Sequence, residues 1–181
     1  MTPLGKLARL AICIAWAAPA TAQTVRDPAV PMRVPEGYVQ ERLLGQWFEV
    51  ARSPSPMEPD CKAVTSEVET RDDSRLTLKL NCHKVSIVGP VIDIDGILVE
   101  HVPGVFVLRL VRLREFGAVT IAVLWQAEDD SLAVLGSPSG KIGWVWSKTA
   151  DPDPAMLDMG IAKLVEAGYV AAEILTPDTA R

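Results

Sequence analysis

The chain is poor in the residues that most catalytic sites use. Histidine occurs only twice in 181 residues, as His83 and His101. The nearest match to a Gly-x-Ser-x-Gly nucleophile motif is residues 136–140, which read Gly-Ser-Pro-Ser-Gly and have proline at the centre. Without a histidine beside a nucleophile or a carboxylate pair, general acid–base catalysis has no support. We therefore expect a protein that is not an enzyme, with no metal and no cofactor.

Long hydrophobic runs and basic clusters are also missing. The apolar stretch Leu10–Ala18 is well short of the ~20 residues that a membrane-spanning helix needs. The formal net charge is -5, and a chain that is acidic without a basic run is a poor match for nucleic acid. We expect a soluble monomer or dimer that binds no nucleic acid. Peripheral contact with a membrane stays open.

Residues 1–22 have the pattern of a secretory signal peptide. Lys6 and Arg9 precede the apolar stretch, and Ala20-Thr21-Ala22 fits a signal-peptidase site, so the mature chain would begin near Gln23 and be secreted, in bacteria to the periplasm. An alternative is a lipid anchor on Cys13. The bulky Ile12 before this cysteine argues against the anchor, because a small residue is expected there.

Only Cys61 and Cys82 remain after the signal segment. An even number of cysteines in an exported protein predicts a disulfide. The loop of about 20 residues that it would close is worth roughly 3 kcal/mol of stability. Two free thiols are one alternative. A metal site that includes His83 is another, but it would lack the usual four ligands.

After a Pro-rich extended arm at residues 23–42, short apolar runs alternate with turn signals. The clearest period-2 pattern is residues 76–80, and its partner before the turn is residues 64–68. A register that pairs 68 with 76, 66 with 78 and 64 with 80 puts both apolar rows on one face. The same register places position 62, not Cys61, opposite Cys82, so a bulge or a diagonal bridge would be needed.

Further strands are predicted at 92–101, 105–114, 119–125 and 132–137, and the first and last strands bring the number to eight. Eight antiparallel strands at hairpin spacing predict an all-β, up-and-down barrel over residues 43–181. One helix is predicted at 153–167, with Asp153 as N-cap, Pro154 in its first turn and Gly168 at its end. Its apolar stripe should pack on the outside of the barrel, and Tyr169–Leu175 should pair with an edge as a short strand.

Two segments carry a resemblance to a known family. Residues 45–52, Gly-Gln-Trp-Phe-Glu-Val-Ala-Arg, resemble the opening strand of a lipocalin, and residues 143–149, Gly-Trp-Val-Trp-Ser-Lys-Thr, resemble its closing strand. The local likeness is to bacterial outer-membrane lipocalins and apolipoprotein D. The chain departs from this pattern at 126–129, where only the acidic character of the family's second motif survives, and at Lys148, where the family has arginine.

The resemblance implies a cup-shaped barrel, or calyx, that holds a small hydrophobic ligand. Gly45, Trp47 and Lys148 would form its closed end, with the lysine lying over the indole as a cation–π partner. The expected ligand-binding residues are Val64, Ser66, Val68, Leu78, Leu80, Val119, Ile121, Val123, Trp144 and Trp146. An apolar lining with a few polar groups suits a fatty acid or a lysophospholipid, to be carried or sequestered.

Three further sites bear on this hypothesis. Arg109, Arg112 and Arg114 are expected on a solvated face, although one of them near the mouth would pair with an acidic head group. His101 would be the ligand if the barrel held haem, but it lies near a strand end.

One alternative function is an interaction protein with a solid barrel. The other is a small enzyme that modifies a lipid or a pigment, which would require Glu49 to be buried inside the barrel.

Overall fold

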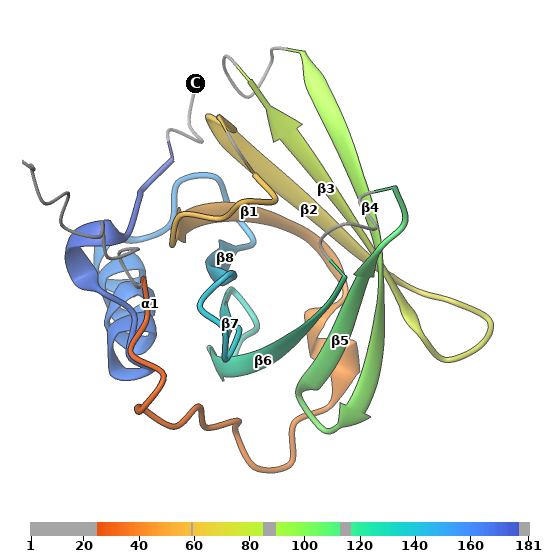
Figure 1. Cartoon of the computed structure of the whole chain (residues 1–181), viewed down its shortest axis with the longest axis horizontal. Coiled ribbons are helices and arrows are strands. Elements are labelled where there is room, and N and C mark those ends of the chain that lie inside the picture. The colour runs from red at the N-terminus through yellow and green to blue at the C-terminus, as the bar shows by residue number, and fades with distance from the viewer. Residues whose placement is uncertain (1–24, 59, 85–89, 113–116, 178–181) are drawn as a thin grey trace, which may run out of the picture.

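Eight antiparallel strands form a closed barrel in which neighbours in the chain are neighbours in the sheet, and β8 pairs with β1 (Figure 1). The computed structural model describes residues 25–58, 60–84, 90–112 and 117–177, so the signal segment, Cys13 and Arg114 lie outside it. The strands are β1 Gly45–Arg52, β2 Ala63–Thr70, β3 Leu76–His83, β4 Val91–Val102, β5 Val105–Leu110, β6 Ala118–Gln126, β7 Leu132–Gly136 and β8 Gly143–Ser147. The predicted all-β, up-and-down barrel is therefore confirmed. Within the described ranges, no helix has the length and apolar character needed to cross a bilayer.

The register between β2 and β3 differs from the predicted one. Val68 pairs with Leu78, not with position 76, because the loop between the two strands is two residues longer than expected. Thr70 and Leu76 already form the last pair, and Ser74 takes the left-handed conformation (φ 63°) that closes the short loop. A shift of two residues leaves each side chain on its predicted face, because side chains alternate with a period of two.

The predicted disulfide between Cys61 and Cys82 is present, with a Cα–Cα distance of 5.3 Å. The residue opposite Cys82 is Val64, so the expectation of position 62 was wrong for the same reason as the register. Cys61 lies before β2 begins. The bridge therefore ties the connection between β1 and β2 to the far end of β3.

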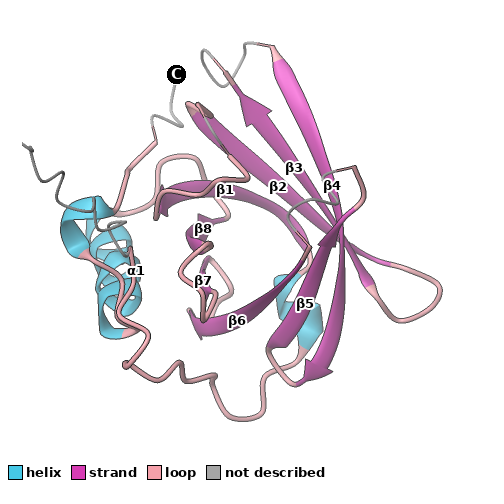
Figure 2. Ribbon diagram, in the orientation of Figure 1, coloured by secondary structure: helices cyan, strands magenta, loops and turns pink. Residues whose placement is uncertain are grey.

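The helix α1, Pro154–Glu166, covers one outer side of the barrel over β7 and β8 (Figure 2). As predicted, the Asp153 side chain accepts a hydrogen bond from the Ala155 N–H, and Gly168 ends the helix with φ +94°. Gly160 allows the close approach, since a Cβ there would lie 2.6 Å from a methyl group of Val145. The helix thus buries the apolar outer face of these strands.

The segment after the helix is not the predicted strand. A short 3-10 helix, η3 Ala171–Glu173, interrupts it, and only isolated bridges form, Arg26 with Tyr169 and Arg52 with Leu175. The first of these bridges ties the arm to the helix end, where buried Arg26 also donates to the Ala167 carbonyl at 2.9 Å. From there the arm runs around the outside of the barrel (Figure 1).

The closed end of the barrel has the geometry that the family resemblance implies. The short 3-10 helix η1, Gln40–Leu43, lies across this end, and the Trp47 indole donates to the Leu43 carbonyl at 2.8 Å. The Lys148 Nζ lies 3.5 Å from the centroid of the Trp47 ring and donates to the Leu44 carbonyl at 2.8 Å. Gly45 is required here, because its φ is +95° and a Cβ would lie 3.3 Å from that Nζ.

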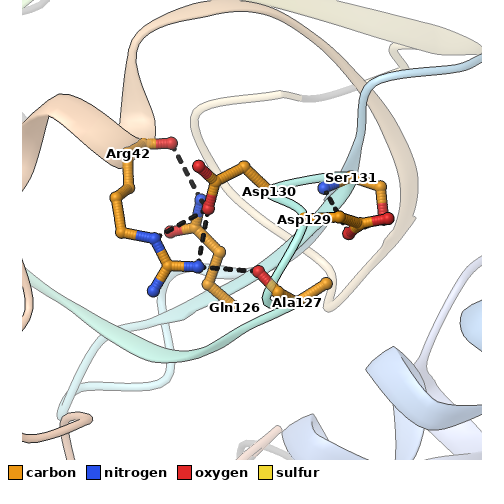
Figure 3. A network of polar contacts seen from close by, with 6 residues as sticks. All are labelled: Arg42, Gln126, Ala127, Asp129, Asp130 and Ser131. Atoms are coloured by element: carbon orange, nitrogen blue, oxygen red, sulfur yellow. Dashed lines mark hydrogen bonds and ion pairs between the residues drawn. The ribbon is translucent and has the colours of Figure 1, made fainter.

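A polar network fastens η1 to the turn between β6 and β7 (Figure 3). Asp130 accepts from the Arg42 Nε at 2.7 Å, and Gln126 donates to the Arg42 carbonyl at 2.8 Å. Asp129, by contrast, only bonds to its neighbour Ser131. The acidic turn of the second motif therefore has a partner within the chain, and Asp130 provides it.

Replacing both cysteines by alanine is expected to lower the free energy of unfolding by about 3 kcal/mol, because the unfolded chain loses a cross-link over a 21-residue separation. Urea unfolding followed by tryptophan fluorescence measures the difference. Wild-type protein treated with a reductant is the matched control and should lose a similar amount. Equal stability of oxidised wild type and the double variant would contradict this prediction.

Candidate functional site

The ten residues predicted to bind a ligand all lie inside the barrel. None is more than 6% exposed, and they pack with Trp47 and Phe106 into one core. They are Val64, Ser66 and Val68 of β2, Leu78 and Leu80 of β3, Val119, Ile121 and Val123 of β6, and Trp144 and Trp146 of β8. Their side chains contact each other in this structure, so ligand contact by these residues stays a prediction.

Three indole rings form a continuous aromatic column in the interior. Trp146 lies 6.2 Å from Trp47 at the closed end and stacks on Trp144 at 5.2 Å, centroid to centroid. Trp144 is the second residue of β8 and lies toward the open end of the barrel. The column therefore spans the interior and accounts for much of its filling, because indoles have the largest side-chain volume.

A cleft of about 390 Å³ opens at the other end of the barrel from Trp47, beside the connection between β1 and β2. Apolar side chains, the disulfide and four charged residues line it. They are Pro56, Met57, Cys61, Cys82, Lys84, Ile92, Asp93, Ile94, Asp95 and Arg112. None of the ten predicted residues is among them. The accessible part of the site is therefore the mouth, above the packed interior.

Two cations lie at this mouth. The hydrogen bond from the Val111 N–H to the Asp95 carbonyl continues the ladder of β4 and β5, so Arg112 shares the inward face of Leu110. Lys84 shares the inward parity of Cys82 on the other side of β4. The predicted solvated face is correct for Arg109, which is exposed. Arg112 is exposed as well, and it also lines the cleft, where it can meet an anionic group.

A bulge in β1 places two charged residues inside the barrel. Glu49 pairs with Trp146, but the register then slips by one residue, so Arg52 pairs with Trp144 and faces inward as well. Val50 and Ala51 both pack outward beneath α1. Without the extra residue, strict alternation would turn Arg52 to the outside.

These residues form a buried cluster with Glu58 from the connection between β1 and β2. The Arg52 guanidinium donates to the Glu49 carboxylate at 2.8 Å and to the Cys61 carbonyl at 2.5 Å. The Trp144 indole donates to the Glu58 carboxylate at 3.3 Å. Glu49, Glu58 and Arg52 are 0%, 3% and 6% exposed. The guanidinium thus pairs directly with Glu49 and acts on Glu58 through its charge alone.

Burial controls the protonation of this cluster. Burial raises the pKa of Glu58 to about 7, although Arg52 and the Trp144 indole lower it. Burial and the nearby charge of Glu58 raise the pKa of Glu49 well above its ordinary value, and Arg52 opposes them. The charges of the two carboxyl groups and Arg52 act on one another, and one proton on the carboxyl pair would make the cluster neutral with Arg52.

One oxygen of each carboxyl group has no hydrogen-bond partner among the described residues. These atoms are Glu49 Oε2 and Glu58 Oε1. A buried polar atom without a partner costs about 1–3 kcal/mol, so a ligand group that supplies the partner would gain binding energy there. The sequence identified Glu49 but missed Arg52 and Glu58. Strict alternation from Trp47 would put Arg52 on the outer face, and Glu58 lies in a proline-rich turn that carries no periodic signal.

The histidine considered for haem lies away from the mouth. His101 is exposed near the end of β4, at the turn that leads into β5. Across the described ranges, no group of three or more His, Cys, Asp or Glu side chains is arranged to hold a metal ion.

Comparisons with known proteins agree with this architecture. A family model described as a lipocalin-like domain matches residues 40–179. Among solved structures, lobster apocrustacyanin A1 superposes with a TM-score of 0.60 at 16% identity, covering 76% of this chain and 77% of that one. Apocrustacyanin C2 gives 0.59 at 16% identity, covering 75% and 76%. At this identity the structures show the fold alone. No curated protein matches in sequence.

The raised pKa of Glu58 predicts how stability depends on pH. The ordinary pKa of 4.5 applies to the unfolded chain, so the folded chain binds the proton more tightly. This stabilisation is complete below pH 4.5 and is lost as the pH rises through about 7. We expect the free energy of unfolding to fall by about 1–3 kcal/mol between pH 5 and 8, measured by urea unfolding.

Glu58→Gln is the control for this titration, because the amide has a similar shape and no proton to lose. Its stability should change less over the same pH range. A wild-type profile that is flat, rises with pH, or coincides with that of the variant would contradict the assignment.

Proposed function

This chain belongs to the lipocalin-like family, and from that premise we propose that it binds a small hydrophobic ligand with an acidic head group, of the fatty-acid or lysophospholipid class. The protein would carry or sequester this ligand without altering it. The narrower likeness to bacterial outer-membrane lipocalins and apolipoprotein D is part of the same proposal.

The observation that carries the proposal is the chemistry of the mouth cleft. Met57, Ile92 and Ile94 provide an apolar surface, and burial of each ligand methylene there would contribute about 0.8 kcal/mol. Arg112 and Lys84 lie at the same cleft and suit a carboxylate or phosphate group. Asp93 and Asp95 reduce the net charge of the cleft, so the cations would favour a monoanion over a highly charged ligand.

Below the cleft, the acyl tail would reach the packed inward rows. We propose that the ten predicted residues form this deeper part of the site and that their side chains move apart as the tail enters. Met57 is suited to such an adjustment, because its unbranched side chain has three rotatable bonds. The closed end would stay rigid, since Trp47 is held by Leu43 and Lys148.

We place the protein outside the cytoplasm, in the periplasm if residues 1–22 are cleaved as a signal peptide. The Cys61–Cys82 disulfide supports this location, because such bridges persist in oxidising compartments. A lipid anchor on Cys13 remains the alternative. A monomer or a dimer would suit either location.

The packed interior favours one alternative, an interaction protein with a solid barrel, because no predicted lining residue is more than 6% exposed. The enzymatic alternative required a buried Glu49, and Glu49 is buried. Its carboxylate is held by Arg52, however, and is 0% exposed, which favours binding over catalysis.

Native mass spectrometry of the protein exported to a bacterial periplasm, with its extracted lipids identified in parallel, tests the proposal. We expect a stoichiometric acyl ligand. A protein that is purified empty and also ignores added tetradecanoic acid and lysophospholipid would instead support the interaction protein.

The head-group contact has its own test. Arg112→Ala should weaken the binding of tetradecanoic acid about tenfold, or ~1.4 kcal/mol, because the cleft loses a cation. The matched control is Arg109→Ala, which removes an exposed cation of β5 away from the cleft. Isothermal titration calorimetry measures both affinities. Equal affinity in the two variants would show that Arg112 does not hold the head group.

A further inference from the structure

The buried cluster of Glu49, Arg52 and Glu58 adjoins two residues that line the mouth cleft. Met57 and Cys61 line the cleft. Glu58 follows Met57 in the chain, and the Arg52 guanidinium donates to the Cys61 carbonyl at 2.5 Å. A ligand that enters past Met57 would therefore reach the segment that carries Glu58.

Glu58 offers an unused hydrogen-bonding atom at this point. Its Oε2 accepts from the Trp144 indole at 3.3 Å, while its Oε1 has no partner among the described residues and is shielded from solvent. Glu49 also has an unpaired oxygen, but its other oxygen is held by Arg52 and the side chain is 0% exposed. A plain hydrocarbon chain packed here would leave the Glu58 oxygen unsatisfied.

The chemistry of the cluster limits which ligand group would fit. Glu49 and Glu58 with one proton balance the single positive charge of Arg52, so neither an added cation nor an added carboxylate is needed for neutrality. Burial raises the pKa of Glu58 to about 7, so near neutral pH both protonation states are populated. The ionised oxygen accepts a hydrogen bond, and the protonated carboxyl group donates one. A hydroxyl group both donates and accepts, and can therefore pair with either form.

We propose that Glu58 is the contact for a hydroxyl group on the ligand, and that the preferred ligand is a hydroxylated acyl acid instead of a plain one. This inference rests on the proposed function, because the acyl acid must first bind at the mouth. The hydroxyl group would form the hydrogen bond that Glu58 Oε1 lacks. It would therefore make the protein select hydroxylated acyl acids over plain ones.

Matched acids test the selectivity in the wild-type protein. Tetradecanoic acid is compared with its 2-hydroxy and 3-hydroxy forms, and octadecanoic acid with its 12-hydroxy form, by calorimetry at pH 7. We expect at least one hydroxylated acid to bind ten- to a hundredfold more tightly than its parent. If the parents bind and no hydroxylated form gains, this inference fails while the proposed function stands. If neither these acids nor lysophospholipid binds, the proposed function fails.

Two variants of Glu58 then assign the contact. Glu58→Gln keeps a donor and an acceptor, and should retain the preference for the hydroxylated acid. Glu58→Leu should lose the preference and bind the plain acid at least as well as the wild type does. The control is Ser53→Ala, which removes a different buried and unpaired oxygen just after β1, at a residue that does not line the cleft, and should retain the preference.

Thermal unfolding of each variant checks that it is folded. If Glu58→Leu does not fold, the Glu58→Gln variant and the wild-type comparison still decide the matter. A preference that persists in folded Glu58→Leu, or that is lost equally in Ser53→Ala, would overturn the assignment to Glu58.

Discussion

The interior of this barrel depends on one backbone irregularity, the bulge between Glu49 and Ala51 in β1. A regular strand would place Glu49 inside and Arg52 outside, and would bury a carboxylate without its counter-ion. The extra residue turns Arg52 inward as well, where the two side chains pair at 2.8 Å. It also turns Val50 and Ala51 outward together, so that both pack beneath α1. The same deviation therefore serves the inner charge cluster and the outer apolar layer, because any residue added to a strand reverses the faces of those that follow.

The two ends of the barrel differ in kind. At the closed end, Trp47, Lys148 and Gly45 occupy one compact arrangement, and the Arg42 network holds η1 over it. There Trp47 donates to Leu43, Lys148 donates to Leu44 and Arg42 donates to Asp130. At the mouth, apolar side chains and the cations Lys84 and Arg112 line an open cleft. A ligand can therefore be admitted at one end without disturbing the contacts that hold the other.

Between these ends, stacked indoles and a buried charge cluster fill the space that a wide calyx would leave open. Trp144 belongs to both, since its ring stacks on Trp146 and its N–H meets Glu58. A ligand that moves past Met57 and displaces Trp144 would therefore change the contacts of both the aromatic column and the carboxyl pair. Affinity and selectivity would then come from separate parts of the site. The apolar cleft would supply the hydrophobic contribution, and the buried polar atoms would distinguish ligands of equal length.

The sequence by itself determined the fold class, the inward rows, the helix with its caps and the disulfide. Each of these follows from local information: the period-2 pattern at 76–80, the residues Asp153, Pro154 and Gly168, and a single pair of cysteines after residue 22. Tertiary structure alone decided the register of β2 and β3, because a shift of two residues preserves every face. It also decided the inward turn of Arg52, the place of Glu58 and the position of the open cleft. These features depend on the packing of bulky side chains from strands that are distant in the sequence. A periodic pattern within one strand does not predict such packing.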